Sequence, residues 1–275
     1  MTKNIDRLIE VMARLRDPKG GCPWDLEQDF RSIAPYTLEE TYEVVEAIEA
    51  GDPAAIKDEL GDLLFQVVFH AQMGREAGLF DLEAIAGHVA DKMIERHPHV
   101  FGDRNAETAE AVLANWEADK AKKREARARA ENRAPSVLDG VSSALPAAAH
   151  AVKLQNRAAR VGFDWTDARD ILAKIKEEIG ELEHEIGRNS GKDGNQAAVE
   201  DELGDVFFAL ANLARRLDID PEQALRGTNR KFERRFREIE RRLKAEGRTI
   251  GQASLEEMER LWGEIKNEEK LKKVG

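Results

Sequence analysis

The chain carries the same pattern of acidic residues twice, and this repeat limits its fold more than any other feature. Each copy contains two short motifs in which two carboxylates lie three residues apart: Glu40 with Glu43 and Glu59 with Asp62, then Glu178 with Glu181 and Glu202 with Asp205. Because residues three apart share a face of an α-helix, each motif points two carboxylates in one direction. The repeat therefore predicts two copies of one helical unit, each presenting four acids.

A helix breaker separates the two motifs in each copy. It is Gly51-Asp52-Pro53 in the first copy, and it lies between Gly187 and Asn195 in the second. This arrangement predicts two antiparallel helices joined by a loop. At ~1.5 Å per residue the motifs lie about 9 to 12 Å from the breaks, so the acidic pairs should meet at similar heights. Four converging carboxylates repel one another unless a cation lies among them, and such an all-oxygen cluster suits Mg²⁺ or Mn²⁺.

The sequence around the motifs repeats as well. Residues 58–65 read DELGDLLF, and residues 201–208 read DELGDVFF. Two later pairs follow in the same order: Lys92 to Arg96 parallels Lys231 to Arg235, and Trp116-x-x-x-Lys120 parallels Trp262-x-x-x-Lys266. Shared features in one order at similar spacing indicate an internal duplication.

Apolar residues recur with the period of an α-helix almost everywhere, so we expect an all-α fold of two repeated helical-bundle domains. The expected helices span residues 3–16, 36–50, 53–77, 81–96, 106–133, 145–159, 167–187, 196–216, 221–245 and 254–271, with a turn at His97-Pro98-His99. The basic stretch 120–133 has no large apolar side chain and precedes Pro135, which predicts a solvated helix leading into a linker. We therefore expect domains at 1–133 and 134–275.

The composition excludes several classes of protein. The net charge is -11, so a general nucleic-acid-binding surface is not expected. The longest apolar runs, at residues 63–69 and 206–213, are too short to span a bilayer, and the N-terminus lacks the apolar core of a signal peptide. Cys22 is the only cysteine, which rules out an internal disulfide and fits a reducing compartment. We expect a cytoplasmic protein with neither a nucleic-acid nor a membrane partner.

An isolated pair of glutamates three residues apart is usually a solvated helix face, but these acids lie beside apolar segments. Asp62 and Asp205 directly precede Leu63-Leu64-Phe65 and Val206-Phe207-Phe208. Because burying a carboxylate without a partner is costly, acids in this position indicate partners or a metal ion.

These segments resemble the MazG family of nucleoside triphosphate pyrophosphohydrolases in its two-repeat form, over nearly the whole chain. The most specific segments are Gly21-Cys22-Pro23-Trp24-Asp25, residues 39–48, the two Glu-Leu-Gly-Asp blocks, residues 229–236 and Leu261-Trp262-x-x-x-Lys266. The resemblance implies Mg²⁺-dependent hydrolysis of NTPs and dNTPs to the monophosphate and pyrophosphate. It also implies an all-α fold that forms a homodimer.

The resemblance implies a site in the second copy. The metal ligands that it implies are Glu178, Glu181, Glu202 and Asp205, and the positions expected to hold the nucleotide are Lys174, Glu177, Lys231, Arg234, Arg235, Trp262 and Lys266. Glu177 and Glu178 are the candidate catalytic residues, Glu178 as a ligand and Glu177 as a free acid that takes a proton from water. One departure is Ala198, where the family often has a lysine.

The residue types agree with phosphoryl transfer, which depends mainly on positioning and on neutralising charge. Lys231 and Arg235 lie one helical turn apart, with Arg234 beside them, which suits a triphosphate. Trp262 offers a flat surface on which any base can stack, and this favours broad base tolerance.

The cations, not the acids, distinguish the two copies. Tyr36 stands where the second copy has Lys174, and Glu95 stands where it has Arg234. Pro98 should also end the first copy's helix soon after Arg96. We therefore expect turnover in the second copy, and a structural or dimerising role for the first, whose acids Glu40, Glu43, Glu59 and Asp62 form a weaker candidate metal site.

Two other functions stay open at this point. A non-enzymatic helical interaction or regulatory protein would bind a basic partner through its acidic face, but it leaves the cluster of Lys231, Arg235 and Trp262 unexplained. A phosphohydrolase restricted to one substrate, such as dUTP or dCTP, would use the same acids.

Overall fold

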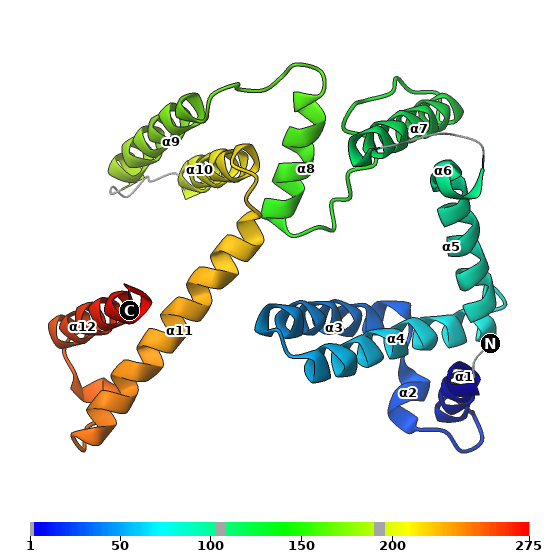
Figure 1. Cartoon of the computed structure of the whole chain (residues 1–275), viewed down its shortest axis with the longest axis horizontal. Coiled ribbons are helices and arrows are strands. Elements are labelled where there is room, and N and C mark those ends of the chain that lie inside the picture. The colour runs from blue at the N-terminus through cyan, green and yellow to red at the C-terminus, as the bar shows by residue number, and fades with distance from the viewer. Residues whose placement is uncertain (1–2, 103–107, 190–195, 275) are drawn as a thin grey trace. The chain divides into compact units, whose positions relative to one another are not determined.

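A computed structural model describes residues 3–102, 108–189 and 196–274, and every regular element in these residues is a helix (Figure 1). The helices are α1 (Lys3–Leu15), α2 (Pro23–Glu27), α3 (Phe30–Ala50), α4 (Pro53–Glu76), α5 (Leu82–Arg96), α6 (Pro98–Phe101), α7 (Ala109–Ala130), α8 (Ala147–Ala159), α9 (Ala168–Asn189), α10 (Gln196–Arg216), α11 (Pro221–Ala245), the 3₁₀ turn η1 (Ile250–Gln252) and α12 (Leu255–Val274). The predicted all-α fold is confirmed. Within the described ranges, no helix is both long and apolar enough to cross a membrane.

The chain forms two compact units, Met1–Asp119 and Lys120–Gly275. The division falls inside α7, whereas the sequence suggested a boundary between residues 133 and 134. A continuous helix carries the chain across this division, and the domain boundary expected from the sequence stays a prediction.

A hairpin of α3 and α4 forms the centre of the first unit. Asp29 caps α3 by accepting hydrogen bonds from the amides of Arg31 and Ser32. Gly51 ends α3 with a φ of 69°, a left-handed conformation that favours glycine. Asp52 caps α4 immediately afterwards, with Pro53 in the first turn. The predicted breaker is therefore a tight turn between two helices.

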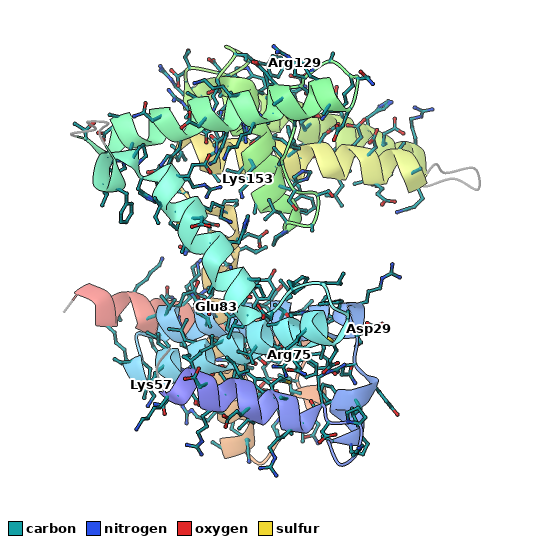
Figure 2. The ribbon with its side chains drawn as sticks, turned by 90° about the vertical axis from the view of Figure 1, so that its right-hand side faces the viewer. Asp29, Lys57, Arg75, Glu83, Arg129 and Lys153 are labelled. Atoms are coloured by element: carbon teal, nitrogen blue, oxygen red, sulfur yellow. The ribbon has the colours of Figure 1, made fainter. Side chains whose placement is uncertain are left out.

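The two helices of this hairpin run antiparallel, as predicted. In Figure 2, Lys57 and Arg75 mark opposite ends of α4, and Asp29 at the start of α3 lies at the Arg75 end. Helix α1 packs against α4. The buried core of this unit consists of Met12, Ile33, Val68, Phe69 and Met73.

The second unit contains the equivalent hairpin, made of α9 and α10. Most of its predicted connector, residues 190–195, lies outside the described residues. Ile171 and Ile175 of α9 pack against Ala209 of α10, and α8 packs across α10 in the same way that α1 packs on α4.

Helices α11 and α12 form a second arm of this unit, with a core of their own (Figure 1). That core consists of Ile239, Leu243, Leu261 and Ile265. Helix α11 has the bounds predicted from the sequence, because Asp220 caps it and Pro221 occupies its first turn.

Three local elements differ from the sequence prediction. Helix α3 begins at Phe30, six residues before the predicted start, because the reciprocal bonds of Asp29 and Ser32 start it and Pro35 is accommodated inside it. The short helices α2 and α6 were not predicted. In α6, Pro98 occupies the first turn, where its missing N–H costs nothing, so the expected turn at residues 97–99 is a single helical turn.

Candidate functional site

Three acids of the second repeat converge between α9 and α10. Oxygen atoms of Glu178, Glu181 and Glu202 all lie within 4.8 Å of one another. Glu178 is buried, Glu202 is half-buried and Glu181 is exposed. The antiparallel hairpin produces this convergence, because it brings the motif in the middle of α9 beside the motif in the first half of α10.

Asp205, the fourth predicted ligand, is exposed and is not one of these three groups. It lies close enough to act electrostatically, since its charge helps to raise the pKa of Glu202, after the larger effect of desolvation. The pKa of Glu181 is also raised, first by a hydrogen bond to Glu178, then by desolvation and by the charge of Glu178. These shifts are those of carboxylates held close together and partly desolvated.

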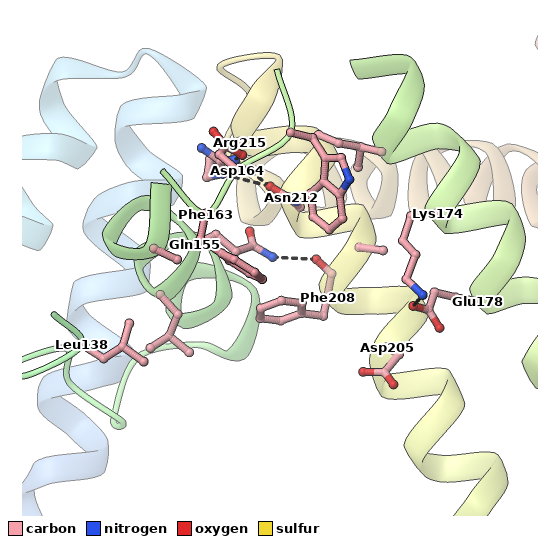
Figure 3. Close-up of a pocket in the computed structure, with 15 residues that line it drawn as sticks. Leu138, Gln155, Phe163, Asp164, Lys174, Glu178, Asp205, Phe208, Asn212 and Arg215 are labelled. Atoms are coloured by element: carbon pink, nitrogen blue, oxygen red, sulfur yellow. Dashed lines mark hydrogen bonds and ion pairs between the residues drawn. The ribbon is translucent and has the colours of Figure 1, made fainter. Parts of the chain in front are cut away.

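Lys174 lies at the edge of this cluster. Its Nζ is 2.9 Å from Oε1 of Glu178 and 2.8 Å from Oε1 of Glu177, and these two bonds raise the pKa of the lysine. Figure 3 shows Lys174 pointing along α9 to Glu178, with Asp205 of α10 nearby. Glu177 and Glu178, the predicted catalytic residues, therefore both bind the ammonium group of Lys174.

A cavity of about 400 Å³ opens beside these acids, and the sequence did not predict it. Lys174, Glu178 and Asp205 line it, and so do the aromatic side chains of Phe163, Trp165 and Phe208. Figure 3 shows Phe163 and Phe208 on the side away from Lys174. Phe163 and Trp165 belong to a Gly-x-x-Trp segment that begins at Gly162, which has a φ of 86°. The first repeat has the corresponding segment Gly21-Cys22-Pro23-Trp24, and this parallel was the available sequence signal.

The remaining predicted nucleotide contacts are carried by α11 and α12 and are here called the basic cluster: Lys231, Arg234, Arg235, Trp262 and Lys266. The guanidinium carbon of Arg235 lies 5.3 Å from the centre of the Trp262 ring. Arg234 and Arg235 each approach Glu269 at 2.8 Å. Sequence reasoning missed Glu269, which neutralises part of the cluster's charge.

None of these five described side chains lines the cavity beside the acids. The predicted residues thus lie on two pairs of helices, α9 with α10 and α11 with α12, and the cavity beside the acids is not lined by both sets. Ala198, at the family's lysine position, shares a shallow depression on α10 with Asp205.

The first repeat builds a similar acidic cluster from Glu40, Glu43 and Glu59, whose oxygen atoms also lie within 4.8 Å of one another. Desolvation, followed by the neighbouring carboxylates, raises the pKa values of Glu40 and Glu59. Tyr36, in place of Lys174, packs edge-on against Trp24 at 5.7 Å. At the position that holds a cation in the second repeat, the first repeat therefore has an aromatic side chain that packs against another ring.

Both clusters have the chemistry expected of a divalent-cation site. Their donors are carboxylate oxygens from two facing helices, which is the ligand type that Mg²⁺ and Mn²⁺ prefer. A hydrogen bond raises the pKa of Glu181 most and desolvation raises that of Glu202 most, and neighbouring carboxylate charges add to both shifts. A bound cation would offset those charges. The residues therefore fit a hard divalent metal ion.

Comparison with known proteins agrees with the repeat. The family described as the MazG nucleotide pyrophosphohydrolase domain matches the chain twice, at residues 28–101 and 167–239. The chain is 50% identical over 265 residues to a nucleoside triphosphate pyrophosphohydrolase of Escherichia coli (strain K12), which covers 96% of this chain and 98% of the relative. It is 37% identical over 262 residues to the nucleoside triphosphate pyrophosphohydrolase/pyrophosphatase MazG of Thermotoga maritima, covering 95% of each. A nucleoside triphosphate pyrophosphohydrolase of Mycobacterium tuberculosis is 35% identical over 160 residues, or 58% of this chain and 46% of the relative.

Proposed function

The chain belongs to the MazG family of nucleotide pyrophosphohydrolases, and we propose that it hydrolyses ribo- and deoxyribonucleoside triphosphates to the monophosphate and pyrophosphate. We place turnover in the second repeat. The observation that carries this proposal is the convergence of Glu178, Glu181 and Glu202 beside Lys174, at the mouth of a cavity large enough for part of a nucleotide.

We propose Mg²⁺ as the cofactor, with Mn²⁺ as a substitute. Glu178, Glu181 and Glu202 would hold it, with Asp205 as the fourth ligand predicted from the sequence. A bound divalent cation supplies positive charge to the phosphate oxygens, which is the main requirement of phosphoryl transfer. The cation would also compete with the ammonium group of Lys174 for the carboxylate of Glu178.

Lys174 and Glu177 would then act on the substrate. Released from Glu178, the ammonium group of Lys174 can donate hydrogen bonds to phosphate oxygens. Glu177 is exposed and is not one of the clustered acids, so its carboxylate can accept a proton from the attacking water. Lys174 donates to Glu177 at 2.8 Å and so orients that carboxylate beside the site.

The basic cluster would contribute charge for the rest of the triphosphate. Arg235 has the best-defined position, because Glu269 holds its guanidinium group from one side and the ring of Trp262 packs against it. Since the cluster does not line the cavity within one chain, we propose that a homodimer places it near the acids of the partner.

Exposed apolar stripes support a homodimer. On α10, Leu203, Phe207 and Leu210 are 42%, 63% and 44% exposed, and their spacing puts them on one helical face. The equivalent positions of α4 in the first repeat, Leu60, Leu64 and Val67, are exposed as well. A second copy of the chain offers the same stripe for packing, as two-fold symmetry requires.

We also propose a cytoplasmic location, because Cys22 is a free cysteine and the proposed substrates are cellular nucleotides. The test of the function is an assay of the eight common NTPs and dNTPs with Mg²⁺, with products identified by ³¹P NMR. We expect the monophosphate and pyrophosphate from several bases. Stepwise release of orthophosphate, with accumulation of the diphosphate, would contradict the proposal, and activity on a single dNTP would restrict it.

A further inference from the structure

We propose that Glu269 is a positioning residue, which holds Arg234 and Arg235 together so that both can bind one pair of adjacent phosphate groups. This role rests on the proposed function, because it assumes that the basic cluster binds the triphosphate end of the substrate. The ligand expected for the two arginines is the pyrophosphate part of a nucleoside triphosphate.

Arg234 and Arg235 would diverge without a shared partner. They are neighbours on α11, and neighbouring side chains leave an α-helix about 100° apart. Their guanidinium groups also carry the same charge. Both nevertheless meet the carboxylate of Glu269 on α12. Nε and Nη2 of Arg235 lie 3.0 and 2.8 Å from its Oε2, and Nε and Nη2 of Arg234 lie 2.9 and 2.8 Å from its Oε1. One carboxylate thus brings the two groups together, one at each oxygen.

The opposite ends of the two guanidinium groups remain for a ligand. In Arg234 and in Arg235, Nη1 makes no hydrogen bond or ion pair among the described residues. Guanidinium N–H groups are strong donors to phosphate oxygens. Two guanidinium groups held by one carboxylate therefore present donors to two neighbouring phosphate groups.

Arg234 depends on Glu269 more than Arg235 does. The side chain of Arg235 is only 16% exposed, and its guanidinium carbon also lies 5.3 Å from the centre of the Trp262 ring. The side chain of Arg234 is 59% exposed, and Glu269 is its only ion-pair partner among the described residues. Ordering an exposed arginine costs conformational entropy, and Glu269 orders this one before the substrate binds.

The pairing of α11 with α12 has other sources. Arg242 of α11 binds Glu268 and Glu264 of α12 at 2.7 and 3.5 Å, and the two helices share an apolar core. A further exposed ion pair adds little to stability. An acid beside a phosphate site also lowers the positive charge of that site, so the contribution that we assign to Glu269 is the geometry that it imposes on the arginines.

The first repeat has the opposite charges at these positions. Glu95 stands in place of Arg234, and Lys123 stands in place of Glu269 when the tryptophans of the two repeats are aligned. An acid at the position of Glu269 thus accompanies two adjacent arginines, and a lysine accompanies the repeat that has one arginine there. This is the pattern expected of an acid that serves the arginine pair.

The test is Glu269→Gln, which keeps the size of the side chain but removes its charge and one of its two acceptor oxygens. The quantities measured are KM for ATP and the inhibition constants of inorganic pyrophosphate and AMP, all with Mg²⁺. We expect KM and the inhibition constant of pyrophosphate to rise at least about fivefold, because the ligand itself must then order two arginine side chains. The inhibition constant of AMP should not change, because AMP lacks the two outer phosphate groups.

Glu268→Gln is the matched control. Glu268 is the neighbouring acid on α12, and it binds Arg242, which is outside the basic cluster. This variant should leave all three constants unchanged. A second comparison places Glu269→Gln in a background that already carries Arg234→Ala and Arg235→Ala. It should have no further effect on KM or on the inhibition by pyrophosphate there, because the side chains through which it acts are gone.

A further effect of Glu269→Gln in that background would overturn the inference. So would an equal loss of affinity for pyrophosphate and AMP, or unchanged or tighter binding of pyrophosphate by Glu269→Gln. Absence of inhibition of the wild type by pyrophosphate, or loss of the helical circular dichroism signal in Glu269→Gln, would overturn it as well. If the wild-type enzyme releases no pyrophosphate from any nucleotide, the proposed function itself has failed, which is a separate result.

Discussion

Replacing Glu202 by Gln is the most direct test of the acidic site. Glu202 is the member of the close cluster that comes from α10, while Glu178 and Glu181 both come from α9. The substitution removes a charged ligand and leaves the two clustered acids on a single helix, so a cation would no longer bridge the hairpin. Loss of a residue that only orients a metal ligand typically costs about 10- to 100-fold, so loss of a ligand should cost at least about 100-fold in kcat/KM.

Glu59→Gln is the matched control, because Glu59 holds the same place in the first repeat's cluster. It should reduce pyrophosphate release much less, if the second repeat is the catalytic one. Both variants should keep their helices by circular dichroism, since each removes one charge from a repelling group. Equal inactivation by the two substitutions would refute our division of labour, and nearly full activity of Glu202→Gln would refute the metal assignment.

The basic cluster, the carboxylates and the apolar stripes each give one further prediction. Arg235→Ala should lower kcat/KM at least about tenfold, since a charge-assisted hydrogen bond is worth about 1.5–3 kcal/mol; the exposed Arg237→Ala is the control in the same steady-state assay. The pKa values of Glu181 and Glu202 are raised, so protons compete with the cation for these two groups at a higher pH than they would for ordinary glutamates. The affinity for Mn²⁺, measured by electron paramagnetic resonance, should therefore fall as the pH decreases from neutral. The same raised values mean that Glu181 and Glu202 destabilise the metal-free fold as the pH rises through the carboxylate range and cease to do so below it. Metal-free thermal melts should therefore show that Glu202→Gln gains stability relative to the wild type at neutral pH and loses that advantage at low pH. Phe207→Glu should raise the dimer dissociation constant at least about tenfold in sedimentation equilibrium, because it puts a charge into the apolar stripe.

Features that depend on local chemistry and periodicity were predictable from the sequence. Helix α11 has its predicted bounds because Asp220 and Pro221 define its start chemically. Glu178 and Glu202 meet because the spacing of each motif from the breaker fixes its height on the hairpin. These properties are set within one or two turns of helix, where a sequence pattern is informative.

Features that depend on contacts between distant helices were not predictable in the same way. The pairing of Glu269 with Arg234 and Arg235 joins α12 to α11, and periodicity gives no indication of which acid on α12 faces that pair. The cavity has a similar origin, since it exists where no side chain fills the space between α8, α9 and α10. A pattern of apolar residues shows which faces are buried, but it does not show how completely their side chains fill the interior.

The two repeats therefore differ in the size of the side chains at equivalent site positions as well as in the charge of those side chains. Both keep a cluster of three close carboxylates, so the hairpin alone is sufficient to build that feature. In the first repeat Tyr36 replaces the cation at the cluster's edge, and Phe69 stands at the position of Asn212, an amide that lines the cavity. Each change substitutes a ring for a polar group, and both rings pack against other side chains of the first unit. Restoring one cation to the first repeat would leave the position of Phe69 filled, and replacing Phe69 by a small amide would leave the first repeat without a counterpart of Lys174 at its proposed phosphate site. The asymmetry between the repeats is thus the result of at least two independent substitutions, and no single reversal of charge should produce a second active site.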